Sequence, residues 1–151
     1  MANTQAMCTS FKKELLLGHH NFGVGVVRAA TTADTFMASL RLATDSTGAG
    51  TTAYSATGEV SGTNYTAGGV TISGWSAPAT SGTSAYTTPT ASFTWTGVTL
   101  SSSFDCVLIY NSTQSNKAVS SHTFGAQTVT AGNFSITMPV NAAGTALLQI
   151  N

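Results

Sequence analysis

The chain has 151 residues and a formal net charge of zero at pH 7, with only five Lys or Arg and five Asp or Glu residues. This balance leaves no electrostatic attraction for nucleic acid or an anionic membrane. The hydrophobic share of 42% exceeds that of disordered polar chains. The length fits one domain, and no run of about 18 apolar residues suggests a membrane span. The first residues lack the basic and apolar regions of a signal peptide, so we expect none.

The first expected element is an amphipathic helix within residues 1–18. Met7, Phe11 and Leu15 recur every four residues and would form one apolar stripe on it. Gly18 suits the left-handed position that often follows the last helical turn. The stripe either packs across the open end of the β domain or reaches into a neighbouring subunit, and the sequence leaves both possibilities open.

After Gly18 the hydrophobic period changes from about four to about two, which is typical of β-strands. Residues 36–42 alternate as a half-buried strand does, and residues 104–110 are apolar on nearly both faces, as expected of a central strand. The remaining expected strands are residues 24–28, 70–75, 92–96, 117–124, 134–138 and 146–150.

Turn signals separate these strands. They lie at residues 115–116, 131–133 and 141–144, and the tracts 44–53 and 76–89 are predicted as long exposed loops, with interdomain linkers as the alternative. No strand is followed by a convincing crossover helix, which argues against a parallel sheet. The pattern therefore predicts an all-β fold over residues 19–151, an antiparallel β-sandwich or partly closed barrel in one domain.

No residue pattern indicates a metal site. His19 and His20 are adjacent, so their side chains point apart, and His122 is the only other histidine. Zinc needs three or four ligands, so we expect His19 and His20 to form a solvated connector. Cys8 and Cys106 are expected to be buried thiols, although a bridge between them stays open.

The sequence also contains no pattern typical of an enzyme. The serines follow no G-x-S-x-G motif, and Asp105 is expected on the solvated face of its strand or paired with Lys117 or Arg41. We therefore expect no catalytic residues and no cofactor. The candidate partner contacts are aromatic residues in or beside loops and the N-terminal stripe, namely Met7, Phe11, Leu15, Tyr54, Tyr65, Trp75 and Tyr86.

Three stretches of the chain are similar to small structural proteins of tailed bacteriophages. They are residues 93–119 (FTWTGVTLSSSFDCVLIYNSTQSNKAV), residues 57–70 (TGEVSGTNYTAGGV), and residues 11–16 (FKKELL) with the following His20-Asn21-Phe22. The similarity covers nearly the whole chain and consists of turn and strand patterns without catalytic residues.

The resemblance implies a capsid cement or decoration subunit, a jelly-roll-like β-sandwich on the outside of the phage head. Such a subunit would bind the major capsid protein and copies of itself, forming a homo-oligomer that bridges capsomers and stabilises the shell. It would be located in the virion after assembly in the host cytoplasm. A tail, neck or fibre-associated virion subunit and a carbohydrate-binding module stay open as alternatives.

The placement of charge fits an assembly subunit. Seven of the ten charged residues precede Thr47, whereas residues 60–104 hold none, nor do residues 118–151. Small polar faces cost less to desolvate than charged ones, and interface cores are depleted in charge. We therefore expect these two charge-free regions to provide much of the contact surface.

Overall fold

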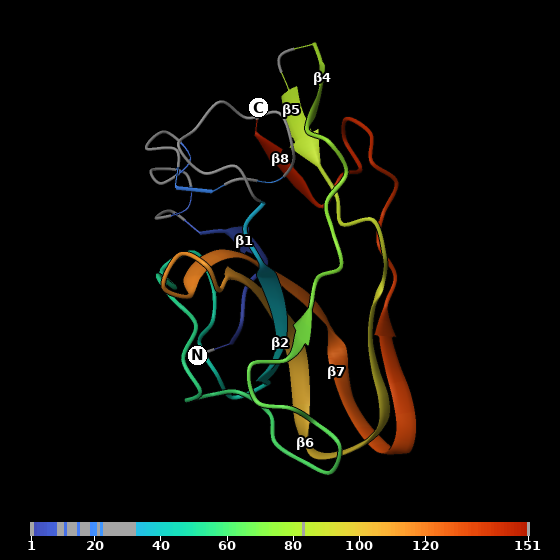
Figure 1. The fold of residues 1–151 in the computed structure, drawn as a ribbon. Coiled ribbons are helices and arrows are strands. Elements are labelled where there is room, and N and C mark those ends of the chain that lie inside the picture. Colours follow the sequence, from blue (N-terminus) through green and yellow to red (C-terminus); the bar gives the residue numbers. More distant parts are fainter. Residues whose placement is uncertain are drawn as a thin grey trace.

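The fold is built from antiparallel β-strands, as Figure 1 shows. The computed structural model describes residues 2–8, 11, 15, 19–20, 22, 33–82 and 84–150. Its strands are β1 (Ala6–Met7), β2 (Phe36–Leu42), β3 (Val70–Thr71), β4 (Ala79–Ser81), β5 (Ser84–Thr87), β6 (Phe93–Asn111), β7 (Lys117–Ile136) and β8 (Leu148–Ile150). The prediction of a mostly antiparallel β protein is confirmed.

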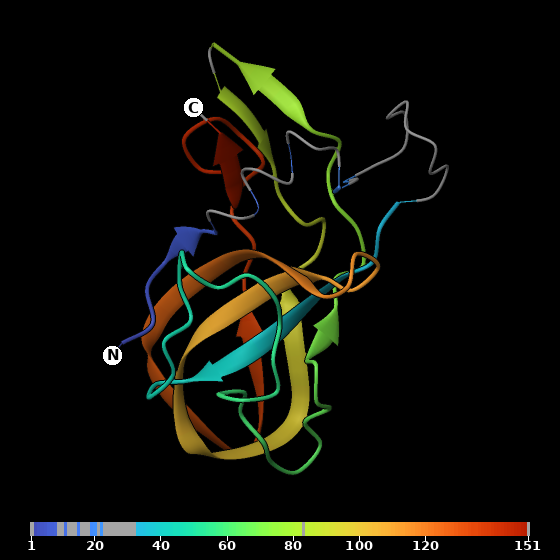
Figure 2. The same ribbon diagram turned by 90° about the vertical axis from the view of Figure 1, so that its left-hand side faces the viewer.

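The described strands form two sheets. The larger has the order β1-β7-β6-β2-β3 and the smaller the order β4-β5-β8, and every pairing is antiparallel. The smaller sheet projects away from the larger one, with β8 beside β5 (Figure 2). Among the described residues no helix is long and apolar enough to cross a membrane.

Strand β2 has the bounds that the sequence predicts, but both of its faces are covered. Phe36, Ala38 and Leu40 lie in the core, and Ser39 and Arg41 on the opposite face are also buried. The segment that follows β2 folds back over this second face, where Arg41 donates to the carbonyls of Ser55 and Thr57. The expectation of a half-buried strand is therefore wrong on this face.

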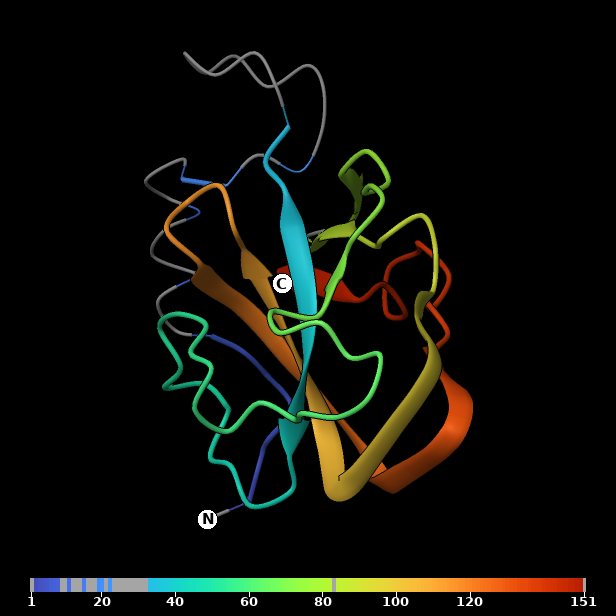
Figure 3. The same cartoon turned by 60° about the horizontal axis from the view of Figure 1, so that its bottom comes forward.

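Strands β6 and β7 form one long hairpin that turns through a common bend, which Figure 3 shows. The sequence predicts two separate strands along each of them, and the structure joins each pair into one. Residues 131–133, predicted as a turn, lie within β7, where Ala131 has a φ of 46° beside a shift in register. The predicted turn at residues 115–116 is confirmed, because Ser115 and Asn116 both have positive φ between β6 and β7.

The tract 76–89, predicted as an exposed loop, contains β4 and β5. The two strands pair from Ala79 with Tyr86 to Ser81 with Ser84. The pairing between the two segments continues beyond these strands toward the larger sheet, since Ser76 N donates to Thr88 O. The residues that suggest a loop here are small and polar, and cross-strand hydrogen bonds hold them in a hairpin. We call residues 74–90 the arm.

The helix predicted within residues 1–18 is not seen as a continuous element in the described residues, where Phe11 and Leu15 are helical but Ala6 and Met7 are not. Ala6 and Met7 instead form β1, which pairs with Ser121 and Ser120 of β7, and Cys8 N donates to Val119 O. The edge of β7 offers unpaired backbone groups at this point, and pairing with them overrides a helical hydrophobic period. Residues 9–10, 12–14 and 16–18 lie outside the described residues, as does the strand expected at 24–28.

One apolar core extends through both sheets. It includes Phe36, Leu40 and Phe104 of the larger sheet, and Leu148 of the smaller. Both cysteines are buried thiols, as expected, and Cys8 Sγ donates to Gly48 O over 3.7 Å.

Candidate functional site

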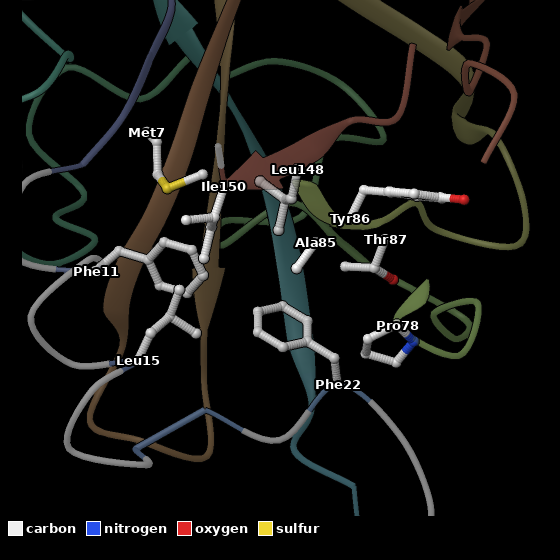
Figure 4. Close-up of a pocket in the computed structure, with 10 residues that line it drawn as sticks. All are labelled: Met7, Phe11, Leu15, Phe22, Pro78, Ala85, Tyr86, Thr87, Leu148 and Ile150. Carbon is white, nitrogen blue, oxygen red and sulfur yellow. The ribbon is translucent and has the colours of Figure 1, made fainter. Parts of the chain in front are cut away.

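An apolar cavity lies where β1 of the larger sheet approaches β5 and β8 of the smaller sheet. It has a volume of about 210 Å³ and opens to solvent. Figure 4 shows its lining, which consists of Met7, Phe11, Leu15, Phe22, Pro78, Ala85, Tyr86, Thr87, Leu148 and Ile150. None of these described residues carries a formal charge, so the cavity is suited to apolar groups.

Strands of both sheets contribute to the lining of this apolar cavity. Met7 reaches it from β1 at the edge of the larger sheet, and Ala85 and Tyr86 reach it from β5. Strand β8 pairs with β5 so that Ile150 lies opposite Ala85 and Leu148 opposite Thr87. Because side chains alternate along a strand, Leu148 and Ile150 share one face, which is the face toward the cavity.

Four of the seven predicted contact residues meet at this cavity: Met7, Phe11, Leu15 and Tyr86. The side chains of the predicted N-terminal apolar stripe therefore meet at one cavity, although Met7 reaches it from strand β1 and not from a helix. Phe22, Leu148 and Ile150 also line the cavity and were not predicted as contacts. The alternation of the predicted strand 146–150 was the available signal for the last two.

Trp75 does not line the apolar cavity, but it packs against Phe22, which does. Its ring lies edge-on to Phe22 at 5.1 Å and to Phe36 at 5.3 Å between centroids, and Phe22 stacks on Phe36 at 5.0 Å. Edge-to-face and offset pairs of this kind add stability beyond the burial of their area. Trp75 thus anchors the base of the arm to β2 instead of presenting a free ring to solvent.

Tyr54 and Tyr65 belong to a polar cluster on the far face of β2. Both hydroxyls donate to the carboxylate of Glu59, over 2.6 Å and 2.7 Å, and Gly68 N donates to the same carboxylate over 2.9 Å. Tyr65 also accepts a hydrogen bond from Leu40 N, and Tyr54 stacks on Tyr110. These contacts fasten the segment after β2 to the sheet.

The environment of this cluster keeps its tyrosines neutral. Burial, followed by the hydrogen bond to Glu59, raises the pKa of Tyr54 to about 12 and also raises that of Tyr65. Burial likewise raises the pKa of Tyr110 to about 12. The hydroxyls therefore act as hydrogen-bond donors at neutral pH, and the two predicted contact residues have a structural role here.

The expectation that His20 is solvated is wrong. Its ring is buried and packs edge-on against Phe11 at 4.8 Å between centroids. Asn111 Nδ2 donates to His20 Nδ1 over 3.0 Å and to Asp34 over 2.8 Å. His20 therefore packs behind Phe11, which lines the apolar cavity, and the buried side-chain amide of Asn111 holds the imidazole in place.

The other polar candidates have structural partners. Asp105 accepts a hydrogen bond from Asn3 over 2.6 Å, and Arg41 forms an ion pair with Asp45 at 2.9 Å. In the part of the chain that the structure describes, no three His, Cys, Asp or Glu side chains gather to hold a metal ion.

A second cavity of about 260 Å³ lies between β1 and β8 and is more polar than the first. It is lined by Gln5, Ala6, Met7, Ser120, His122, Ala146, Leu147, Leu148 and Gln149. Met7 and Leu148 line both cavities and so separate them. Burial lowers the pKa of His122 to about 4, so its imidazole is neutral at pH 7, and Nε2 lies 2.9 Å from Ser120 Oγ.

Comparisons of the chain with protein-family models, with curated proteins and with solved structures found no match.

Proposed function

We propose that the chain is a structural subunit of a tailed-bacteriophage virion, namely a cement or decoration subunit that binds the outer head surface and bridges capsomers. In this proposal the two sheets belong to a jelly-roll-like sandwich, and the subunit binds the major capsid protein and copies of itself. The role is one of assembly and not of catalysis, and its location is the capsid.

The observation that carries the proposal is the meeting of Met7, Phe11, Leu15 and Tyr86 at one open apolar cavity. An open cavity of this kind accepts an apolar side chain of a partner subunit, and such anchors provide much of the binding energy of interfaces. The resemblance of residues 93–119 to phage structural proteins supplies the class of assembly.

The exposed surface of the charge-free regions gives further support. Thr71 of β3 and Thr94 of β6 are both exposed, and both lie between residues 60 and 104. Threonine loses less side-chain entropy on ordering than lysine, and its hydroxyl costs less to desolvate than a charge. Modest contacts repeated around a symmetric shell add through multivalency.

Binding to capsid shells tests the proposal. Purified protein is mixed with shells of the phage major capsid protein, and bound copies are counted after sedimentation. The double variant Thr71→Lys with Thr94→Lys should weaken binding to the shell by about tenfold, because two charges would be buried at the contact. A loss of about 1.4 kcal/mol in binding free energy is enough for a tenfold change. Thr44→Lys is the matched control, since Thr44 is exposed beside the charged Asp45.

Occupancy that stays unchanged in the double variant would contradict the proposed contact surface. Electron microscopy of labelled particles separates the head from the rival tail, neck and fibre positions, and a ring at the portal vertex would favour those. Binding of glycans that is lost in Trp75→Ala or Tyr86→Ala would favour a carbohydrate module. The packing of Trp75 against Phe22 and Phe36 gives that alternative less support.

A further inference from the structure

The described part of the chain exposes two large hydrophobic side chains, and they occupy different places. Ile150 is 46% exposed and lies at the apolar cavity, whereas Val140 is 73% exposed and lines neither cavity. Val140 lies in the segment that links β7 to β8, which runs along the outside of the molecule in Figure 1.

The backbone at Val140 is held in place. Pro139 precedes it and restricts the chain on its N-terminal side. The carbonyl of Val140 accepts hydrogen bonds from Ala142 N over 2.9 Å and from Thr145 Oγ1 over 3.0 Å. A β-branched side chain on a fixed backbone has few conformations left to lose, so its burial against a partner costs little entropy.

The apolar cavity is large enough for this side chain and is apolar like it. An apolar cavity of about 150 Å³ is large enough for benzene, so the volume of about 210 Å³ accommodates a valine side chain. Neither the described lining nor the side chains of residues 118–151 carry a formal charge, so an inserted Val140 would meet an uncharged, apolar surface.

We propose that Val140 of one copy inserts into the apolar cavity of a second copy. The protruding residue and its receptor are at different places on the same chain, so the contact is head-to-tail and generates a ring when its rotation closes. This inference rests on the proposed function in taking the cavity as an assembly contact, and it names the occupant as a second copy of this chain.

Disulfide trapping between two different variants tests the contact directly. Val140→Cys protein is mixed with Ala85→Cys protein under mild oxidation, and mixed disulfide dimers are identified by mass spectrometry. Ala85 is exposed at the cavity, so a thiol there is accessible to an inserted residue 140. The native thiols compete poorly because Cys8 and Cys106 are fully buried.

Thr80→Cys supplies the matched control, because Thr80 is exposed on the same arm and does not line the cavity. We expect at least tenfold more mixed dimer from Val140→Cys with Ala85→Cys than from Val140→Cys with Thr80→Cys. Equal yields from the two mixtures would overturn the proposed contact.

Sedimentation of unmodified purified protein gives a second readout. The wild type should self-associate, Val140→Lys should weaken this association at least tenfold, and Val140→Ile should retain it. A wild type that stays monomeric at high concentration overturns the inference. If that monomer still binds shells, the inference fails and the capsid-binding part of the proposed function stands. A protein that self-associates through Val140 but does not bind shells contradicts only the proposed function.

Discussion

At the scale of single residues, the buried guanidinium of Arg41 is surrounded by hydrogen-bond partners. Arg41 is only 3% exposed, and its guanidinium donates to the carboxylate of Asp45 and to the carbonyls of Ser55 and Thr57. Burial alone would raise the pKa of Asp45, but hydrogen bonds from Thr47 and Arg41 outweigh it and lower that pKa. A buried charge is tolerated when it is paired in this way.

His122 provides a prediction at this scale because burial lowers its pKa from 6.5 to about 4. The folded protein binds a proton at this site less readily than the unfolded chain does. Stability is therefore fully present above about pH 6.5 and falls as the pH decreases toward about 4. The loss should be on the order of 2 to 3 kcal/mol, measured as the free energy of unfolding in urea at a series of pH values.

His122→Gln is the control for this titration. Glutamine can still hydrogen-bond to Ser120, whose Oγ lies 2.9 Å from His122 Nε2, but it does not titrate. Between about pH 6.5 and 5, where carboxylates such as Asp45 stay ionised, the unfolding free energy of the wild type should therefore fall more steeply than that of the variant. An equal slope in wild type and variant over that interval would show that another group is responsible.

At the scale of elements, the close approach of β3 to β2 depends on Gly69. Its φ is 81°, and a Cβ at this position would collide with the backbone carbonyl of Ala38. Gly69 N donates to Thr66 O in the turn that precedes β3. The turn therefore requires both the left-handed conformation and the missing side chain.

We predict that Gly69→Ala lowers the free energy of unfolding by about 3 kcal/mol or more. A left-handed alanine costs about 1–2 kcal/mol, and the collision adds a further overpacking cost of about 1–3 kcal/mol. Gly82→Ala isolates the first cost, because Gly82 has a φ of 58° and a Cβ added there would meet no atom within 4 Å. Urea unfolding of both variants measures the difference, and equal losses would contradict the collision.

The strands also show which parts of the fold local sequence patterns can predict. Alternation located β2, and it located parts of β6, β7 and β8, because a two-residue period directly reports which face is buried. It could not join residues 92–96 to 104–110, since a bulged and bent strand loses the regular alternation. The strand at Ala6–Met7 was missed because its partner, β7, lies more than a hundred residues away in sequence.

The candidate site was predicted in part for the same reason. The apolar spacing of Met7, Phe11 and Leu15 identified side chains that share a surface, and they do meet at the apolar cavity. Tyr54 and Tyr65 were predicted as contacts because they lie in loops, yet both donate hydrogen bonds to Glu59. Loop position alone cannot reveal that a loop folds back over a sheet.

At the scale of the whole molecule, the two sheets share one apolar core. Leu148 of β8 belongs to the same buried cluster as Phe104 of β6. The arm is attached to the larger sheet through Trp75, which packs against Phe36 of β2. The apolar cavity is open to solvent, but the buried side chains of the two sheets belong to one continuous cluster.

We therefore predict that the smaller sheet unfolds together with the larger one. Trp75 lies at the base of the arm, and Trp95 lies in β6, where it packs against Phe134 of β7. The variants Trp95→Phe and Trp75→Phe each leave one tryptophan as a fluorescent reporter for one region. Within each variant, the fluorescence transition in urea should coincide with the loss of β-sheet circular dichroism, as two-state unfolding requires. A Trp75 signal that changes at lower urea than the circular dichroism would mean that the arm and β8 separate first, and that the shared core does not couple the sheets.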